Sequence, residues 1–81
     1  MNKITIQDTQ WHKLDNLEDD KEYLFQNLGS YAVEIREGDT VDYGFIINSL
    51  QFYDFKKSSD VDLFVRTMGH VQYSYIISER V

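Results

Sequence analysis

Cysteine and proline are both absent from this chain of 81 residues. Without cysteine, neither a disulfide framework nor a Cys-ligated zinc site can stabilise so small a domain, so its stability has to come from packing, to which self-association can add. Edge strands of β-sheets often use proline to prevent pairing with another chain. In this chain charged side chains have to prevent such pairing. We expect another subunit to cover any edge that they leave open. The candidates are Lys3, Lys13, Asp62 and Arg66.

Basic residues are few: eight Lys and Arg stand against 14 Asp and Glu, which gives a formal net charge of −6. A general nucleic-acid binder needs Lys and Arg to neutralise phosphates, and an anionic membrane surface attracts the same residues, so both functions are disfavoured. The simplest interpretation of the acidic surface is solubility. The alternative is an acidic inhibitor that mimics nucleic acid and blocks a host DNA-binding enzyme. Its phosphate mimics would be Glu18, Asp19, Asp20, Asp39, Asp42 and Asp54.

Long apolar runs are missing as well. Residues 1–10 lack the apolar core of a signal peptide, and no later stretch is long enough to cross a bilayer. We therefore expect no membrane partner, and a protein that is kept in a cytoplasm or carried in a particle assembled there.

Aromatic residues are abundant instead: six Tyr, five Phe and one Trp make up 15% of the chain. Such side chains bury a large area for each residue that is ordered. Apolar and polar residues alternate with the period of a β-strand, as at Tyr31, Val33 and Ile35, and no segment shows a sustained helical period. About six or seven short strands, with turn signals about every eight to twelve residues, predict an all-β fold. We expect a small antiparallel β-sandwich or barrel, with residues 1–81 as a single β-domain.

Two segments have the pattern of β-hairpins. In residues 22–36, two apolar-rich runs meet at Gln26-Asn27-Leu28-Gly29-Ser30, and in residues 61–77 two more flank Met68-Gly69-His70. Residues 3–7 are predicted to form a first strand at a sheet edge, residues 11–14 a short extended piece, and residues 50–55 a further strand. The polar residues 15–21 are expected to form a solvated loop, and Gly44 to mark a bulge or a bent connection.

Residues with catalytic or metal-binding chemistry form no known pattern. His12 and His70 lack the spacing of a metal pair, the acids lack the spacing of a calcium loop, and no Ser stands in a nucleophile elbow or beside a His. Carboxylate pairs for glycoside hydrolysis are available, but a domain of this size rarely encloses the cleft that they need. We therefore expect no enzyme, no metal and no cofactor. Exposed Trp11, Tyr43 or Tyr53 could still stack on a sugar ring, which is the carbohydrate-binding alternative.

Apolar residues occupy both faces of two predicted strands. Phe52 faces opposite to Tyr53 and Phe55, and Phe64 faces opposite to its two apolar neighbours. A two-layer fold buries only one face of each strand, so either both faces are covered within the fold or one face meets another chain. We favour the second explanation. The predicted interface consists of Phe52, Tyr53, Phe55, Phe64 and Arg66.

A series of motifs between about residues 23 and 79 resembles the short β-rich accessory proteins of tailed-bacteriophage particles. In that family a strand, a Gln-Asn-x-Gly turn and a second strand are followed by a Gly/Pro connection, a strand ending in Val-Arg and a final strand. This chain has no Pro in its connection of residues 39–44. The motifs are Tyr23-Leu24-Phe25-Gln26-Asn27-Leu28-Gly29, Val33-x-Ile35, Glu37-Gly38-Asp39-Thr40, Gly44, Leu63-Phe64-Val65-Arg66 and Ile76-Ile77-Ser78-Glu79.

The resemblance implies a non-enzymatic structural role as a capsid-decorating, head-tail or tail-associated module. Members of the family are commonly small symmetric homo-oligomers. The implied partners are further copies of the chain and a larger protein assembly such as a capsid or tail, and the implied location is the virion or the host cytoplasm. On this basis Gln26, Asn27, Gly29 and Arg66 would be fold or interface positions rather than catalytic ones.

Overall fold

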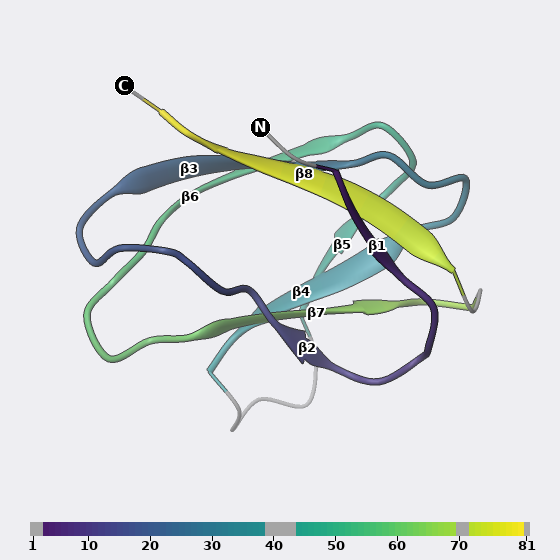
Figure 1. The fold of residues 1–81 in the computed structure, drawn as a ribbon, viewed down its shortest axis with the longest axis horizontal. Coiled ribbons are helices and arrows are strands. Elements are labelled where there is room, and N and C mark those ends of the chain that lie inside the picture. Colours follow the sequence, from purple (N-terminus) through teal and green to yellow (C-terminus); the bar gives the residue numbers. More distant parts are fainter. Residues whose placement is uncertain (1–2, 39–43, 70–71, 81) are drawn as a thin grey trace.

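The computed structural model describes residues 3–38, 44–69 and 72–80. In this part of the chain eight short strands form two four-stranded antiparallel sheets, which pack together and are not closed into a barrel (Figure 1). Sheet A has the strand order β1-β8-β3-β6, and sheet B has the order β2-β7-β4-β5. The strands are β1 (Ile4–Ile6), β2 (His12–Lys13), β3 (Glu22–Asn27), β4 (Val33–Glu37), β5 (Phe45–Ile47), β6 (Phe52–Lys56), β7 (Leu63–Thr67) and β8 (Tyr73–Glu79).

The predicted all-β, antiparallel class is confirmed. The first predicted strand is β1, which lies at an edge of sheet A, and the expected short piece at residues 11–14 is β2. Residues 15–21 form a loop with positive φ at Asn16 and Asp20 (64° and 65°). Among the described residues no helix is long and apolar enough to span a membrane.

The predicted hairpin of residues 22–36 is wrong. Strand β3 pairs with β6 and β8 in sheet A, whereas β4 pairs with β5 and β7 in sheet B. The chain therefore crosses from one sheet to the other between the two strands. The buried side chain of Asn27 shapes this crossing: its Oδ1 accepts a hydrogen bond from the Gly29 N–H, and its Nδ2 donates to the Tyr31 carbonyl.

The predicted hairpin of residues 61–77 is wrong for the same reason. Strand β7 belongs to sheet B and β8 to sheet A, while His70 and Val71 lie outside the described residues. A hairpin turn and a crossing between layers have the same local pattern, because both follow an alternating strand with a Gly-containing turn. Among the described strands, β4 and β5 form the one pair that is consecutive in sequence and adjacent in a sheet.

The core lies between the sheets, and each sheet supplies a different kind of side chain. Sheet A contributes stacked aromatic rings, with centroids 5.0 Å apart for Phe25 and Tyr75 and 5.8 Å for Tyr23 and Phe55. Burying one such side chain contributes about 1.5–3 kcal/mol. Sheet B contributes mainly aliphatic side chains. The buried hydrophobic residues are Leu14, Tyr23, Phe25, Val33, Ile35, Ile47, Phe55, Leu63, Val65, Tyr73 and Tyr75.

The expected edge protection is present at two of the four predicted positions. Lys13 lies in the edge strand β2, and Lys3 directly precedes the edge strand β1. Asp62 precedes β7, where it forms an ion pair with Lys13 at 3.7 Å. Arg66 lies in β7, an inner strand of sheet B, so it protects no edge.

Gly44 directly precedes β5 and lies against β4. A Cβ atom at this position would overlap the carbonyl oxygen of Ile35, so only glycine allows the two backbones to approach this closely. Its N–H donates to the Glu34 carboxylate at 2.7 Å. The sequence prediction of a special connection at Gly44 therefore has a steric cause, the close approach of the chain to β4.

Candidate protein interface

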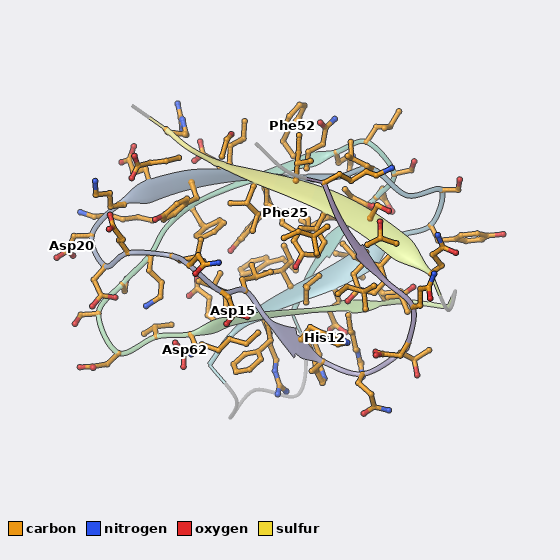
Figure 2. The ribbon with its side chains drawn as sticks, viewed as in Figure 1. His12, Asp15, Asp20, Phe25, Phe52 and Asp62 are labelled. Atoms are coloured by element: carbon orange, nitrogen blue, oxygen red, sulfur yellow. The ribbon has the colours of Figure 1, made fainter. Side chains whose placement is uncertain are left out.

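The five residues of the predicted interface lie in three different places. Phe55 is buried in the core with 7% of its surface exposed, and Tyr53 faces inward on the same strand. Phe52 is 60% exposed on the outer face of sheet A and points away from the core residue Phe25 (Figure 2). Phe64 and Arg66 belong to β7, in the other sheet. The structure therefore does not bring the five side chains together into one patch.

Phe64 and Arg66 lie in an aromatic and cationic cluster on the outer face of sheet B. The guanidinium carbons of Arg36 and Arg66 lie 4.4 Å and 4.6 Å from the centre of the Trp11 ring, and that of Arg36 lies 5.6 Å from the Phe64 ring. The Nε of Arg66 donates to the carboxylate of Glu34 at 3.0 Å. Each stacked cation contributes on the order of 0.5–1 kcal/mol.

This cluster covers much of the apolar surface that the sequence left unexplained on β7. Phe64 is half-buried by residues of its own chain, so for this residue the second face is largely covered within the fold. Trp11 is engaged by two guanidinium groups, and Tyr53 stacks between Phe45 and Phe55 at 5.5 Å and 5.6 Å. Both rings have protein neighbours where the carbohydrate-binding alternative needs open faces. Tyr43, the third residue of that alternative, lies outside the described residues.

A different apolar surface lies along β5, β6 and the turn between them. Phe45, Ile46, Leu50 and Phe52 are 58%, 56%, 61% and 60% exposed. Strands β5 and β6 are edge strands of sheets B and A, and the ring contact between Phe45 and Tyr53 shows that the two edges lie on the same side of the molecule. We call residues 45–56 the β5–β6 edge.

Leu50 has an unusual backbone conformation for its residue type. Its φ is 65°, a value that glycine or asparagine adopts at lower cost, and its side chain projects into solvent. The turn is fixed by hydrogen bonds from the Leu50 N–H to the Asn27 carbonyl at 2.8 Å and from the Gln51 N–H to the Asn48 carbonyl at 3.0 Å. A strained turn thus presents a leucine side chain at the β5–β6 edge.

Sequence reasoning found only Phe52 of this exposed set. Phe45, Ile46 and Leu50 were missed because the segment around Gly44 shows no clear alternation. The available signal was the density of apolar residues in Phe45-Ile46-Ile47-Asn48-Ser49-Leu50-Gln51-Phe52, where they occur at both odd and even positions.

Two hollows on the surface of the described residues are small. One of about 200 Å³ is lined by Gly29, Ser30, Tyr31, Gln72, Tyr73 and Ser74, and one of about 190 Å³ lies beside Ile4, Leu17 and Tyr23. Ligand pockets usually measure about 300–1,000 Å³. Within the described ranges, no group of three His, Asp or Glu residues is placed to hold a metal ion.

His12 has an acidic neighbour on the surface. Its Nε2 lies 2.7 Å from Oδ1 of Asp8. The hydrogen bond with His12, together with one from the Gln10 N–H, lowers the pKa of the Asp8 carboxyl. This exposed pair lies four residues apart along the chain, so it is a local surface contact.

Several acids of the nucleic-acid-mimic hypothesis are compensated by neighbouring cations. Asp19 accepts a hydrogen bond from the buried Lys57 Nζ at 2.9 Å, and Asp54 pairs with Arg80. The Oε2 atom of Glu18 lies 3.4 Å from the Nζ atom of Lys21. Asp20 is exposed at one end of the molecule (Figure 2), while Asp39 and Asp42 lie outside the described residues. Local pairing of this kind reduces the field that a basic partner would meet.

No protein-family model, curated protein or solved structure shows significant similarity to this chain. Its function therefore has to be inferred from the geometry of its own residues.

Proposed function

We propose that the protein is a non-enzymatic structural module that associates with itself and with a larger protein assembly through the β5–β6 edge. The observation that carries the proposal is the exposure of Phe45, Ile46, Leu50 and Phe52, each more than half accessible, along two neighbouring edge strands. Phe45 faces between the sheets, whereas Ile46 and Phe52 lie on the outer faces of sheets B and A, so these edge strands expose apolar surface on several sides. Exposed large apolar side chains on edge strands are typical of surfaces that bind protein. The strained backbone at Leu50 adds support, because folding alone gains nothing from presenting leucine there.

The identity of the larger assembly rests on the motif resemblance. That resemblance supports a capsid or tail of a tailed bacteriophage, and therefore a place in the virion or the host cytoplasm. The size of the hollows supports a binding role over catalysis, because neither reaches the volume of an ordinary ligand pocket.

The acidic inhibitor remains the second proposal, and the net charge of −6 is the observation that favours it. It is the weaker of the two because Glu18, Asp19 and Asp54 already have cationic partners. Binding of this type weakens steeply as salt rises, whereas burial of an apolar edge does not.

The first test is the mass in solution, measured by light scattering at low and high salt. We expect an assembly larger than the 9.6 kDa chain that persists at high salt, and we expect the double variant Ile46→Ser, Phe52→Ser to dissociate. The matched control is Met68→Ser, which removes a 47% exposed apolar side chain away from the β5–β6 edge and should leave the assembly intact. A wild-type chain that is monomeric at all concentrations would contradict self-association.

A further inference from the structure

Strand β6 is the longest edge strand in the described part of the molecule. It has five residues, whereas the other edge strands β1, β2 and β5 have three, two and three. Short edge strands and lysine side chains are devices that prevent pairing between chains. Strands β1 and β2 combine both, because Lys3 and Lys13 accompany them. Strand β6 is long enough to pair with another strand.

The free backbone groups of β6 can be identified from its hydrogen bonds to the neighbouring chain. The Lys57 N–H donates to the Lys21 carbonyl at 2.9 Å, and the Asn27 N–H donates to the Gln51 carbonyl at 3.1 Å. In the register of this pair, odd-numbered residues of β6 therefore bond to β3. Since successive residues of a strand point their N–H and C=O groups to opposite sides, Phe52, Asp54 and Lys56 direct theirs to the open edge.

We propose that β6 pairs with β6 of a second copy, antiparallel and about a two-fold axis at Phe55, so that Asp54 of each copy lies opposite Lys56 of the other. This inference rests on the proposed self-association and specifies its geometry. Both residues have free backbone groups, so each Asp54–Lys56 pair exchanges both backbone hydrogen bonds. Opposite charges directly across a strand pair stabilise it.

Charge selects this register over its neighbours. An axis at Asp54 would place the two Asp54 carboxylates opposite each other, which is repulsive. An axis at Tyr53 would place each Asp54 opposite an apolar Phe52. On the outer face of sheet A, Asp54 already pairs with Arg80, whereas Lys56 is exposed and makes no ion pair with any described residue. Lys56 is therefore available to a carboxylate of the second copy.

The open side of the sandwich also fits a second copy. Phe45 lies opposite the core residue Ile35, so it faces between the sheets, yet it is 58% exposed and stacks on Tyr53 at 5.5 Å. Pairing at β6 continues sheet A from one copy into the next. It brings the β5 strands of the two copies to the same face of the continued sheet. In this register Tyr53, on which Phe45 stacks, lies opposite Lys57 of the other copy, so each Phe45 lies beside the seam on its own side of the axis. Two-fold pairing of one surface with itself is the commonest symmetry of homo-oligomers.

A charge exchange tests the pairing. In the variant Lys56→Asp, the new aspartate of each copy faces Asp54 of the other copy, so two acids oppose each other on each side of the axis. In Asp54→Lys, two lysines oppose each other in the same way. Each single variant should raise the dimer dissociation constant by about tenfold or more, measured by sedimentation, because two attractive pairs become repulsive. The double variant D54K/K56D restores both pairs and should recover dimerisation. The control Arg80→Ala removes the intrachain partner of Asp54 and should still dimerise.

Amide hydrogen exchange provides a second readout that does not depend on substitution. The N–H groups of Asp54 and Lys56 should be protected at concentrations where the chain is dimeric and exchange fast where it is monomeric. A monomeric wild-type chain would overturn both this inference and the proposed self-association. A stable assembly that tolerates Lys56→Asp, with fast exchange at Asp54 and Lys56, would overturn only the β6 pairing. Urea unfolding of each variant shows whether its monomer remains folded.

Discussion

At the scale of single residues, Asn27 does the most to join the two sheets. Its side chain is fully buried at the end of β3, and its amide donates to the carbonyls of Tyr31 and Ile47 at 2.8 Å and 3.0 Å. Its Oδ1 accepts from the Gly29 N–H at 2.9 Å. One amide thus satisfies three backbone groups, one of them at the end of β5 in the other sheet. A buried polar side chain with all these partners fixes one arrangement of the connection.

Replacing Asn27 by alanine should lower the free energy of unfolding by about 3 kcal/mol, because it leaves buried backbone groups without partners. Urea denaturation at neutral pH measures the effect. The matched control is Gln26→Ala at the neighbouring position, where the lost hydrogen bond to the Leu50 carbonyl is exposed; we expect a change below about 1 kcal/mol. Equal effects of the two substitutions would contradict the role of Asn27.

At the scale of elements, the turn between β5 and β6 combines backbone strain with exposed apolar surface. Leu50 holds a φ of 65° while its side chain is 61% exposed. The proposed self-association would explain why a residue that costs stability and contributes little to the core stands at this turn.

The variant Leu50→Gly should therefore separate stability from association. Glycine relieves the positive φ, so the monomer should gain about 0.5–1 kcal/mol in urea unfolding at low protein concentration. Light scattering should show weaker self-association, because the edge loses a large apolar side chain. The control Asn16→Gly changes another residue with a positive φ (64°), beside Ile4 at the opposite edge of sheet A, and should leave association unchanged. If Leu50→Gly weakens the fold as well as the assembly, Leu50 is a folding residue instead.

The strands themselves could be predicted, but their partners could not. Alternation in β4, β7 and β8 and the apolar-rich run of residues 22–25 in β3 placed these strands correctly. Whether Phe25 and Ile35 belong to one sheet or to facing sheets depends on the connection, and Gly29 permits either. The sequence therefore predicted hairpins where the structure has crossings between layers.

At the scale of the whole molecule, the buried tyrosines make the fold sensitive to alkali. Burial raises the pKa of Tyr73, Tyr75 and Tyr53 above the ordinary value of 10.0. The hydrogen bond to Glu79 raises the pKa of the exposed Lys21 as well. For all four groups the folded state favours the protonated form. Their contribution to the free energy of unfolding is therefore fully present below the pKa of the unfolded chain, and it is lost as the pH rises from there through the higher pKa of the folded state.

We expect the free energy of unfolding in urea to fall as the pH rises beyond about 10, where tyrosines of the unfolded chain ionise. Tyr73→Phe keeps the ring and removes the hydroxyl, which lies 3.4 Å from the Val65 carbonyl, so its stability should fall less steeply with pH. Met68→Ser removes no ionisable group and provides the control: it should follow the wild-type pH dependence. Identical pH dependence of Tyr73→Phe and wild type would exclude a contribution from Tyr73.

The sequence by itself determined the all-β class and the alternation of side chains along β4, β7 and β8. Period-two alternation and the absence of helical periodicity depend only on local chemistry. The inward face of β6 was not determined in this way, because Phe55 was expected at an interface and is buried in the core. Of the exposed apolar residues at the β5–β6 edge, the sequence identified one. Phe52 could be found because its exposure follows from alternation within one strand.

Only the tertiary structure decided which strands became edges and which exposed residues came together. Phe45 and Phe52 belong to one edge because β5 and β6 end their respective sheets on the same side, whereas Phe64 was separated from them by the placement of β7 in sheet B. Strand order is set by long-range pairing, in which each pair competes with alternatives of the same local pattern. No local sequence signal distinguishes those alternatives, so the exposed residues of the β5–β6 edge are brought to one side of the molecule only once the two sheets have been assembled.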